Sequence, residues 1–168
     1  QFDSTIFKAE KINTHGGSIR IYIKKGKKIM IENNVKTFLK EEVDYGIKEF
    51  KTYQKFGDKI IKLKVNVINN MNKLKVKNKR IIGYGAPAKA STALNFFGIS
   101  NQIDFIIEDN KLKHNKFIPG VKIQIKDKKN VKDKNSSILV LAWNFFEDIK
   151  KNNSNLSDDF INIKDLEN

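Results

Sequence analysis

The segment that most constrains the fold is residues 81–98, IIGYGAPAKASTALNFFG, where an apolar run leads into a glycine turn and then a helical pattern. Gly83 and Gly85 allow a sharp turn and a close backbone approach, and Ala88 completes a G-x-G-x-x-G/A pattern. A helix that begins here leaves unpaired N–H groups at its N-terminus, which favour phosphate. The segment therefore predicts a strand, a turn and a helix with an anion site, whose candidate residues are Gly83, Gly85, Ala86, Pro87, Ala88 and Lys89.

A second apolar run, residues 103–107, follows that helix and ends in Glu108 and Asp109. An acidic residue about 20 positions beyond the glycines, at the end of the next strand, holds a ribose hydroxyl in dinucleotide-type folds. Two interpretations stay open on this pattern: a turn that binds a nucleotide-like ligand, and a Rossmann-like turn that binds nothing. His114 follows among lysines and is expected to be exposed.

Apolar runs and helical patterns alternate through the rest of this region. Residues 138–142, ILVLA, are fully apolar and suit a central parallel strand covered on both faces. The other expected strands are at 79–84, 104–107, 121–125 and 160–163. Helices are expected at 86–98 and at 145–151, and Asn144 is expected to cap the second of them. This alternation predicts an α/β fold with a Rossmann-like, three-layer, mostly parallel sheet, preceded by a β-hairpin and two helices.

The predicted strands bring three polar segments to one edge of the sheet. Ligands in such sheets bind beyond the carboxyl ends of the strands, which here gathers residues 84–89, 108–110 and 143–144. Asp109, Asn110 and Asn144 are therefore candidates for hydrogen bonds to a ligand.

The N-terminal part of the chain has a different pattern. Residues 1–10 and 18–23 alternate apolar and polar side chains and are expected to form a hairpin around a glycine-rich bend. His15 lies in that bend, either as a general base near neutral pH or as a turn histidine that only hydrogen-bonds locally. Amphipathic helices are predicted at 35–45 and 47–76, the longer of which would cover a sheet or bridge two domains.

Composition narrows the classes of function. The 168 residues contain no cysteine, which excludes disulfides and Cys-based zinc sites and is compatible with a reducing compartment. No apolar run approaches the roughly 18 residues of a membrane span, so we expect a cytoplasmic protein without membrane contact. The formal charge of +14 suggests nucleic acid, but the lysines are spread along the chain and Arg20 and Arg80 are the only arginines. A basic surface without a reader motif does not predict nucleic-acid binding.

Several segments together resemble one family. They are HGGSIR at 15–20, GYGAPAK at 83–89, EDN and PGV within 108–125, and LAWNF at 141–145. In combination, from 14 to 163, they are similar to the C-terminal region of S-adenosylmethionine-dependent C-methyltransferases, including enzymes that methylate carbon 3 of deoxysugar nucleotides. The resemblance implies a three-part enzyme: a small Cys-based zinc unit, a domain that holds the methyl donor, and this Rossmann-like domain, which binds the nucleotide sugar.

The resemblance also implies roles for particular residues. His15 would remove the proton from the carbon to be methylated, which lies next to a keto group, and the enolate would attack the donor's methyl group. Tyr84 or backbone N–H groups would steady the oxyanion, because an imidazole can deprotonate such a carbon only with that help. Lys89 and the glycine turn would hold phosphate, and no metal is expected on this chain.

The chain departs from the family pattern in ways that define its expected domains. It has no cysteine cluster and no glycine-rich donor loop before His15. We therefore expect residues 1–25 to be the closing hairpin of a methyltransferase domain absent from this chain, 26–78 a helical linker and long helix, and 79–168 the substrate-binding domain. Alone, the chain should not methylate. Lys111 stands where many relatives have proline, and Thr14 gives His15 no acidic neighbour.

Two other functions stay open on sequence alone. A nicotinamide-dependent (NAD(P)) oxidoreductase domain is supported by the glycine turn with Glu108 and Asp109. A non-enzymatic basic module that binds RNA or an acidic partner is the third alternative. The oligomeric state is not predicted.

Overall fold

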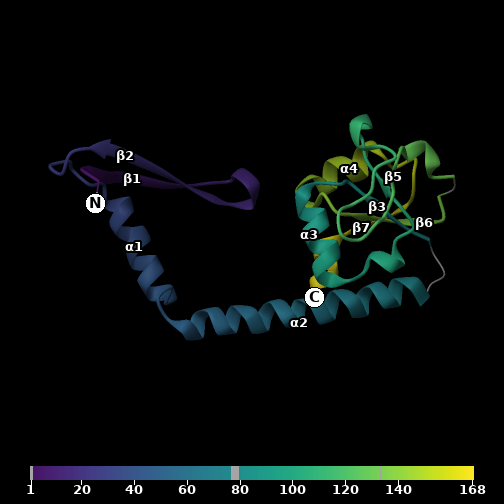
Figure 1. Cartoon of the computed structure of the whole chain (residues 1–168), viewed down its shortest axis with the longest axis horizontal. Helices are drawn as coiled ribbons and strands as arrows, with labels where there is room; N and C mark the ends of the chain where they lie inside the picture. The colour runs from purple at the N-terminus through teal and green to yellow at the C-terminus, as the bar shows by residue number, and fades with distance from the viewer. Residues whose placement is uncertain (1, 77–79, 133) are drawn as a thin grey trace. The chain divides into compact units, whose positions relative to one another are not determined.

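A computed structural model describes residues 2–76, 80–132 and 134–168 of the chain. The chain divides into two compact units, Gln1–Asp58 and Lys59–Asn168, which are described separately below (Figure 1). The long helix α2 (Phe50–Val76) has residues in both.

Unit 1 consists of a hairpin and a helix. Strands β1 (Ser4–Ile12) and β2 (Ser18–Lys25) pair antiparallel around a 3-10 turn, Thr14–Gly16, which confirms the predicted hairpin. Helix α1 (Asn33–Tyr45) follows and packs beside β1. Among the described residues of this unit, Ala9 is the one buried apolar residue. The isoleucines of β2, which are Ile19, Ile21 and Ile23, are each at least half exposed.

The apolar stripe of α2 is buried over only part of its length. Val67 and Met71 are fully buried in the core of unit 2, which agrees with one of the two predicted roles of this helix, that of covering a sheet. The aromatic residues earlier in the stripe are different, since Phe50 is 81% exposed and Phe56 is 58% exposed. In the part of the chain that the structure describes, no helix has both the length and the apolar content needed to cross a membrane.

Unit 2 contains a five-stranded parallel sheet. In chain order its strands are β3 (Arg80–Tyr84), β4 (Ile106–Ile107), β5 (Ile125–Lys126), β6 (Ser136–Val140) and β7 (Asp159–Asn162). Their spatial order is β5-β4-β3-β6-β7, and every pair is parallel. This is the strand order 3-2-1-4-5 of a Rossmann fold, in which the direction of winding reverses between β3 and β6.

The sheet has a hydrophobic core on each face, because successive side chains of a strand point to opposite sides. Ile81 and Leu139 pack into the core that contains α3 (Ala88–Phe97) and the buried part of α2. Ile82 and Ile138 pack into the other core, against side chains of α4 (Phe146–Asn152). Residues 138–140 of the fully apolar segment thus belong to an interior strand covered on both faces, and the three-layer α/β prediction is confirmed.

Two local predictions are wrong. The alternation at 121–125 does not form a strand before Ile125, because Lys122 has a positive φ of 56° and the backbone turns there. Asn144 does not cap the next helix, because residues Trp143–Phe145 form a 3-10 turn and Phe145 takes the capping position without a side-chain bond.

Packing requires glycine both near the end of β3, at Gly83, and in the turn after it, at Gly85. A Cβ on Gly83 would lie 2.7 Å from Ile106 Cγ1, and a Cβ on Gly85 would lie 2.8 Å from the Cβ of Ala142. Gly85 also has a φ of +89°, which disfavours any L side chain. The turn therefore needs glycine whether or not it binds a ligand.

We expect Gly85→Ala to destabilise unit 2 by about 3 kcal/mol, since it combines backbone strain with overpacking. Gly98→Ala is the matched control: Gly98 also has a positive φ, +70°, but no atom lies within 4 Å of the position that its Cβ would take, so strain alone should cost about 1 kcal/mol. Denaturant unfolding followed by the fluorescence of Trp143, the single tryptophan, reports on unit 2. If the two variants lost the same free energy of unfolding, the contact between a Cβ at position 85 and Ala142 would contribute nothing, which would contradict the prediction.

Candidate functional site at the carboxyl edge of the sheet

The carboxyl ends of three strands meet at one edge of unit 2. Tyr84, the last residue of β3, stands in register with Ile107 of β4 and Val140 of β6. The segments that follow these strands are 85–89, 108–110 and 141–144, so the structure brings together the residues that the sequence placed at this edge.

The amide of Ala86, in the turn after β3, already has an acidic partner. Ala86 donates its N–H to Glu108 Oε2 at 2.9 Å, and Lys113 Nζ lies 3.1 Å from the same oxygen. Lys113 Nζ also donates to the carbonyl of Ala86 at 3.1 Å, while the Asn110 N–H donates to Glu108 Oε1. The Glu108 side chain is only 14% exposed, so the protein supplies its own anion at this position.

These contacts determine the charge of Glu108. Burial alone would raise the pKa of the carboxyl group, but the N–H donors of Ala86 and Asn110 and the ammonium of Lys113 outweigh it, and the pKa is lowered. Glu108 is therefore ionised at neutral pH. A phosphate at the Ala86 amide would have to displace it, and a ribose hydroxyl would compete with three existing donors.

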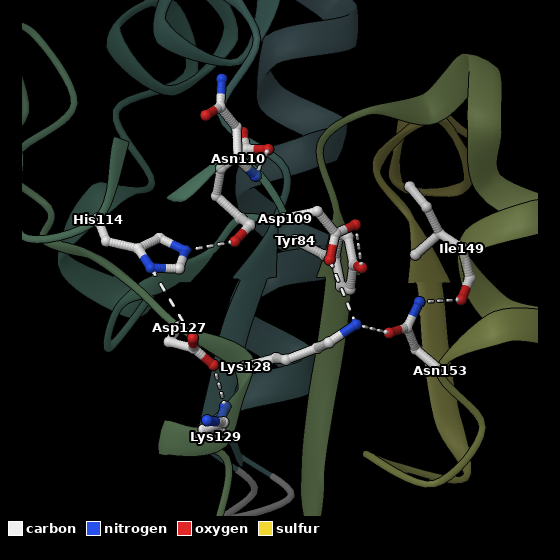
Figure 2. Close-up of polar contacts among 10 residues, drawn as sticks. Tyr84, Asp109, Asn110, His114, Asp127, Lys128, Lys129, Ile149 and Asn153 are labelled. Atoms are coloured by element: carbon white, nitrogen blue, oxygen red, sulfur yellow. Dashed lines mark hydrogen bonds and ion pairs between the residues drawn. The ribbon is translucent and has the colours of Figure 1, made fainter. Parts of the chain in front are cut away.

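Tyr84 and Asp109 belong to a second polar network, in which Tyr84 lies on the face of the sheet that α4 covers (Figure 2). The Tyr84 hydroxyl donates to Asp109 Oδ2 at 2.8 Å, and Lys128 Nζ lies 3.4 Å from Asp109 Oδ1. Lys128 also donates to Asn153 Oδ1, and Asn153 donates to the carbonyl of Ile149 on α4. The network ties the segment after β5 to the carboxyl edge and to α4.

The environment of Tyr84 keeps its hydroxyl protonated. Tyr84 is 3% exposed, and burial together with the bond to Asp109 raises the pKa of the phenol. With its proton directed at Asp109, the hydroxyl is already engaged within the protein.

His114 is more enclosed than the sequence predicts, and that expectation is wrong. Its side chain is 16% exposed, Nε2 lies 2.7 Å from the carbonyl oxygen of Glu108, and Nδ1 lies 3.9 Å from Asp127 Oδ2 (Figure 2). Asp127 also accepts the N–H of Lys129, and its pKa is lowered chiefly by that bond. Sequence reasoning missed His114 and Lys113 because neither lies in a recognisable motif.

The other predicted site residues of unit 2 lie at the start of α3, after β4 and after β6. Pro87 precedes α3 as its N-cap with a φ of −73°, and Ala88 and Lys89 are exposed in the first turn. Asn110 caps the short turn after β4, its side chain accepting the N–H of Leu112, whereas Asn144 is exposed.

Lys89 and Trp143 meet on the β6 side of the turn. Lys89 Nζ lies 5.4 Å from the centroid of the Trp143 ring, and Lys164 Nζ lies 6.0 Å from it. Both ammonium groups are within the distance at which a cation is attracted to an aromatic face.

His15 belongs to unit 1, in the turn between β1 and β2. Its side chain lies outside the part of the chain that the structure describes. The other predicted site residues all belong to unit 2. Within the described ranges, no group of three or more His, Cys, Asp or Glu side chains is arranged to hold a metal ion.

The fold and the edge define a Rossmann-like domain with a glycine turn after its first strand. Residues 13–161 match the family described as the C-methyltransferase C-terminal domain, and the chain belongs to that family. It is 29% identical over 143 residues to the C-methyltransferase NovU of Streptomyces niveus. That alignment covers 83% of this chain and 34% of the relative, so the chain spans about a third of the relative's length. The resemblance to C-methyltransferases is thereby confirmed.

We expect Glu108→Gln to lower the free energy of unfolding of unit 2 by about 1–3 kcal/mol at pH 7, because charged hydrogen bonds are lost. Since the pKa of Glu108 is lowered by folding, its stabilisation is present above the pKa of an unfolded glutamate, about 4.3, and is lost as the pH falls through the folded-state pKa. The two proteins should therefore converge in acid.

Denaturant unfolding at a series of pH values measures this difference. Asp158→Asn is the control, because the Asp158 side chain is 86% exposed and its pairing with Lys134 should contribute little. If the Glu108 variant lost as much free energy of unfolding in acid as at neutral pH, the charge of Glu108 would not be the source of the stabilisation.

Proposed function

We propose that this chain is the substrate-binding domain of an S-adenosylmethionine-dependent C-methyltransferase. The observation that carries the proposal is the family match across residues 13–161. It is supported by the parallel sheet, whose carboxyl edge is where ligands bind in Rossmann-like folds. The family match favours this function over the oxidoreductase and nucleic-acid alternatives.

The proposed substrate is a nucleotide-linked deoxysugar, methylated at a carbon next to a keto group. Such a substrate carries a diphosphate, which needs cationic partners in a domain of this kind. Lys89 is retained as a phosphate ligand, with Ala88 and the other turn residues close by. Asp109, Asn110 and Asn144 remain proposed hydrogen-bonding residues at the same edge.

The proposed chemistry begins with loss of a proton from the substrate. The keto group acidifies the neighbouring C–H, and the imidazole of His15 accepts its proton, leaving an enolate. When bound, S-adenosylmethionine would supply the methyl group: the new carbon–carbon bond would form at the enolate carbon as the bond between the methyl group and sulfur breaks, and S-adenosylhomocysteine would leave. Hydrogen-bond donors must steady the oxyanion, and backbone N–H groups suit this better than Tyr84, whose proton is directed at Asp109.

The glycine turn of unit 2 is proposed above for the substrate, and the chain has no glycine-rich donor loop before His15. We therefore propose that the donor, and any zinc, are held by parts of a longer enzyme outside this chain. The absence of cysteine from the sequence is compatible with a cytoplasmic enzyme.

Calorimetry separates the candidate functions. We expect a thymidine-diphosphate sugar to bind the chain with measurable heat, whereas NAD and single-stranded RNA should give none at the same concentrations. A response to NAD alone would favour the oxidoreductase, because the sugar nucleotide would then lack a site. Binding of RNA alone, with an affinity that falls steeply as the salt concentration rises, would favour the basic nucleic-acid-binding module.

The role of His15 is tested in the enzyme that contains this chain. His15→Asn should abolish exchange of the substrate's C–H proton with deuterated solvent, measured by NMR, because an amide cannot accept that proton. Binding of the substrate, measured in parallel, should persist. Exchange at the normal rate in the variant would remove His15 from the role of base.

A further inference from the structure

A lysine and a glutamate on the loop after β4 form a charge pair that the proposed function does not use. Lys113 Nζ lies 3.1 Å from Glu108 Oε2, and the Glu108 side chain is only 14% exposed. The same ammonium group donates to the carbonyl oxygen of Ala86 at 3.1 Å. Lys113 therefore joins its own loop to the turn after β3, where the substrate's diphosphate is proposed to lie.

The negative charge of Glu108 lies at the same turn. The N–H of Ala86 donates to Glu108 Oε2 at 2.9 Å, and Lys89, the proposed phosphate ligand, follows Ala86 by three residues. Like charges repel more strongly near a protein surface than in bulk water, because the effective dielectric constant is lower there. A carboxylate at this position therefore weakens the binding of a diphosphate to the turn, unless a cation balances it.

The ammonium group of Lys113 provides that balance. Three donors hold the Glu108 carboxylate, namely the N–H groups of Ala86 and Asn110 and the ammonium group of Lys113. The two amides are dipoles without net charge, so they stabilise the carboxylate and leave its charge in place. Of these three donors, Lys113 alone adds a full positive charge, which brings the net charge of the pair to zero.

We propose that Lys113 determines the affinity of the carboxyl edge for its anionic substrate by neutralising Glu108. Lys113 acts through Glu108 and does not touch the substrate. The inference rests on the proposed function, in which the diphosphate lies at the glycine turn, and adds to it a residue that sets the selectivity of the turn for anions. With Lys113 neutral, the remaining charge of Glu108 opposes the diphosphate.

A charge-removing variant tests the inference. Thymidine-diphosphate glucose is titrated calorimetrically into the chain at low ionic strength. Lys113→Met removes the charge but keeps an unbranched side chain of similar length, so the affinity should fall about tenfold. Lys116→Met is the matched control, because Lys116 is an exposed lysine of the same loop whose loss changes the net charge equally. The control should bind within about twofold of the unchanged chain.

A double variant separates the charge of Lys113 from its contacts. Glu108→Gln combined with Lys113→Met returns the net charge of the pair to zero, and the glutamine oxygen can still accept the N–H of Ala86. The affinity should therefore return to within about threefold of that of the unchanged chain. Glu108→Gln alone leaves Lys113 unbalanced and should tighten binding about fivefold, which tests the inference even if Lys113→Met does not fold. Circular dichroism establishes which variants are folded.

Salt provides a measurement that a purely structural role of Lys113 would not change. At about 1 M salt the Debye length is about 3 Å, so the repulsion between Glu108 and the diphosphate is screened. The deficit of Lys113→Met relative to the unchanged chain should shrink from about tenfold to below about threefold. A distorted turn would leave the same deficit at both salt concentrations.

The outcomes distinguish this inference from the proposed function. If Lys113→Met binds as tightly as the unchanged chain, or if Glu108→Gln does not restore its affinity, the inference is overturned and the function is kept. A deficit that is independent of salt would also overturn the inference, because Lys113 would then act by shaping the turn. If thymidine-diphosphate glucose does not bind the unchanged chain, the proposed function fails, and the inference fails with it.

Discussion

The arrangement of the carboxyl edge depends on one charged contact, the Glu108 carboxylate held between the Ala86 amide and the Lys113 ammonium. The contact joins the turn after β3 to the turn after β4, and Lys113 completes it by also bonding the Ala86 carbonyl. A helix N-terminus attracts negative charge. Ala86 lies two residues before α3, and its amide has an anionic partner within the chain, the Glu108 side chain, which is only 14% exposed.

This contact gives the two sides of the glycine turn different properties. On the β4 side, carboxylates and lysines are paired with one another and with backbone groups, so these contacts hold the two turns together. On the β6 side, Lys89 and Lys164 lie against Trp143 beside an apolar groove. The two sides of the turn therefore differ in charge and polarity, a difference that the sequence motif does not show.

Much of the fold could be predicted from the sequence because its signals are local. The apolar run after Ser137 can be covered on both faces only in the middle of a parallel sheet, and the alternation in residues 18–23 requires a strand. The turn at Gly83 and Gly85 was also predictable, although the sequence could not reveal that Ile106 and Ala142 leave no space for a Cβ.

Other features depend on contacts that sequence patterns do not encode. Lys113 follows Glu108 by five residues, and only the turn between them brings the side chains together. The positive φ of Lys122 interrupts a segment that alternates as a strand would. Trp143 and Lys164 lie 21 residues apart and meet because the chain returns through β7, so the groove had no signal in the sequence.

The uneven burial along the chain has a consequence for how its parts open. All five residues of β6 are buried, and β6 is bonded on both sides by β3 and β7, so its amides should exchange with solvent deuterium only when unit 2 unfolds as a whole. The hairpin of unit 1 buries little more than Ala9 among its described residues. Its amides should exchange through small, frequent openings, and the turn that carries His15 can be rearranged at little energetic cost.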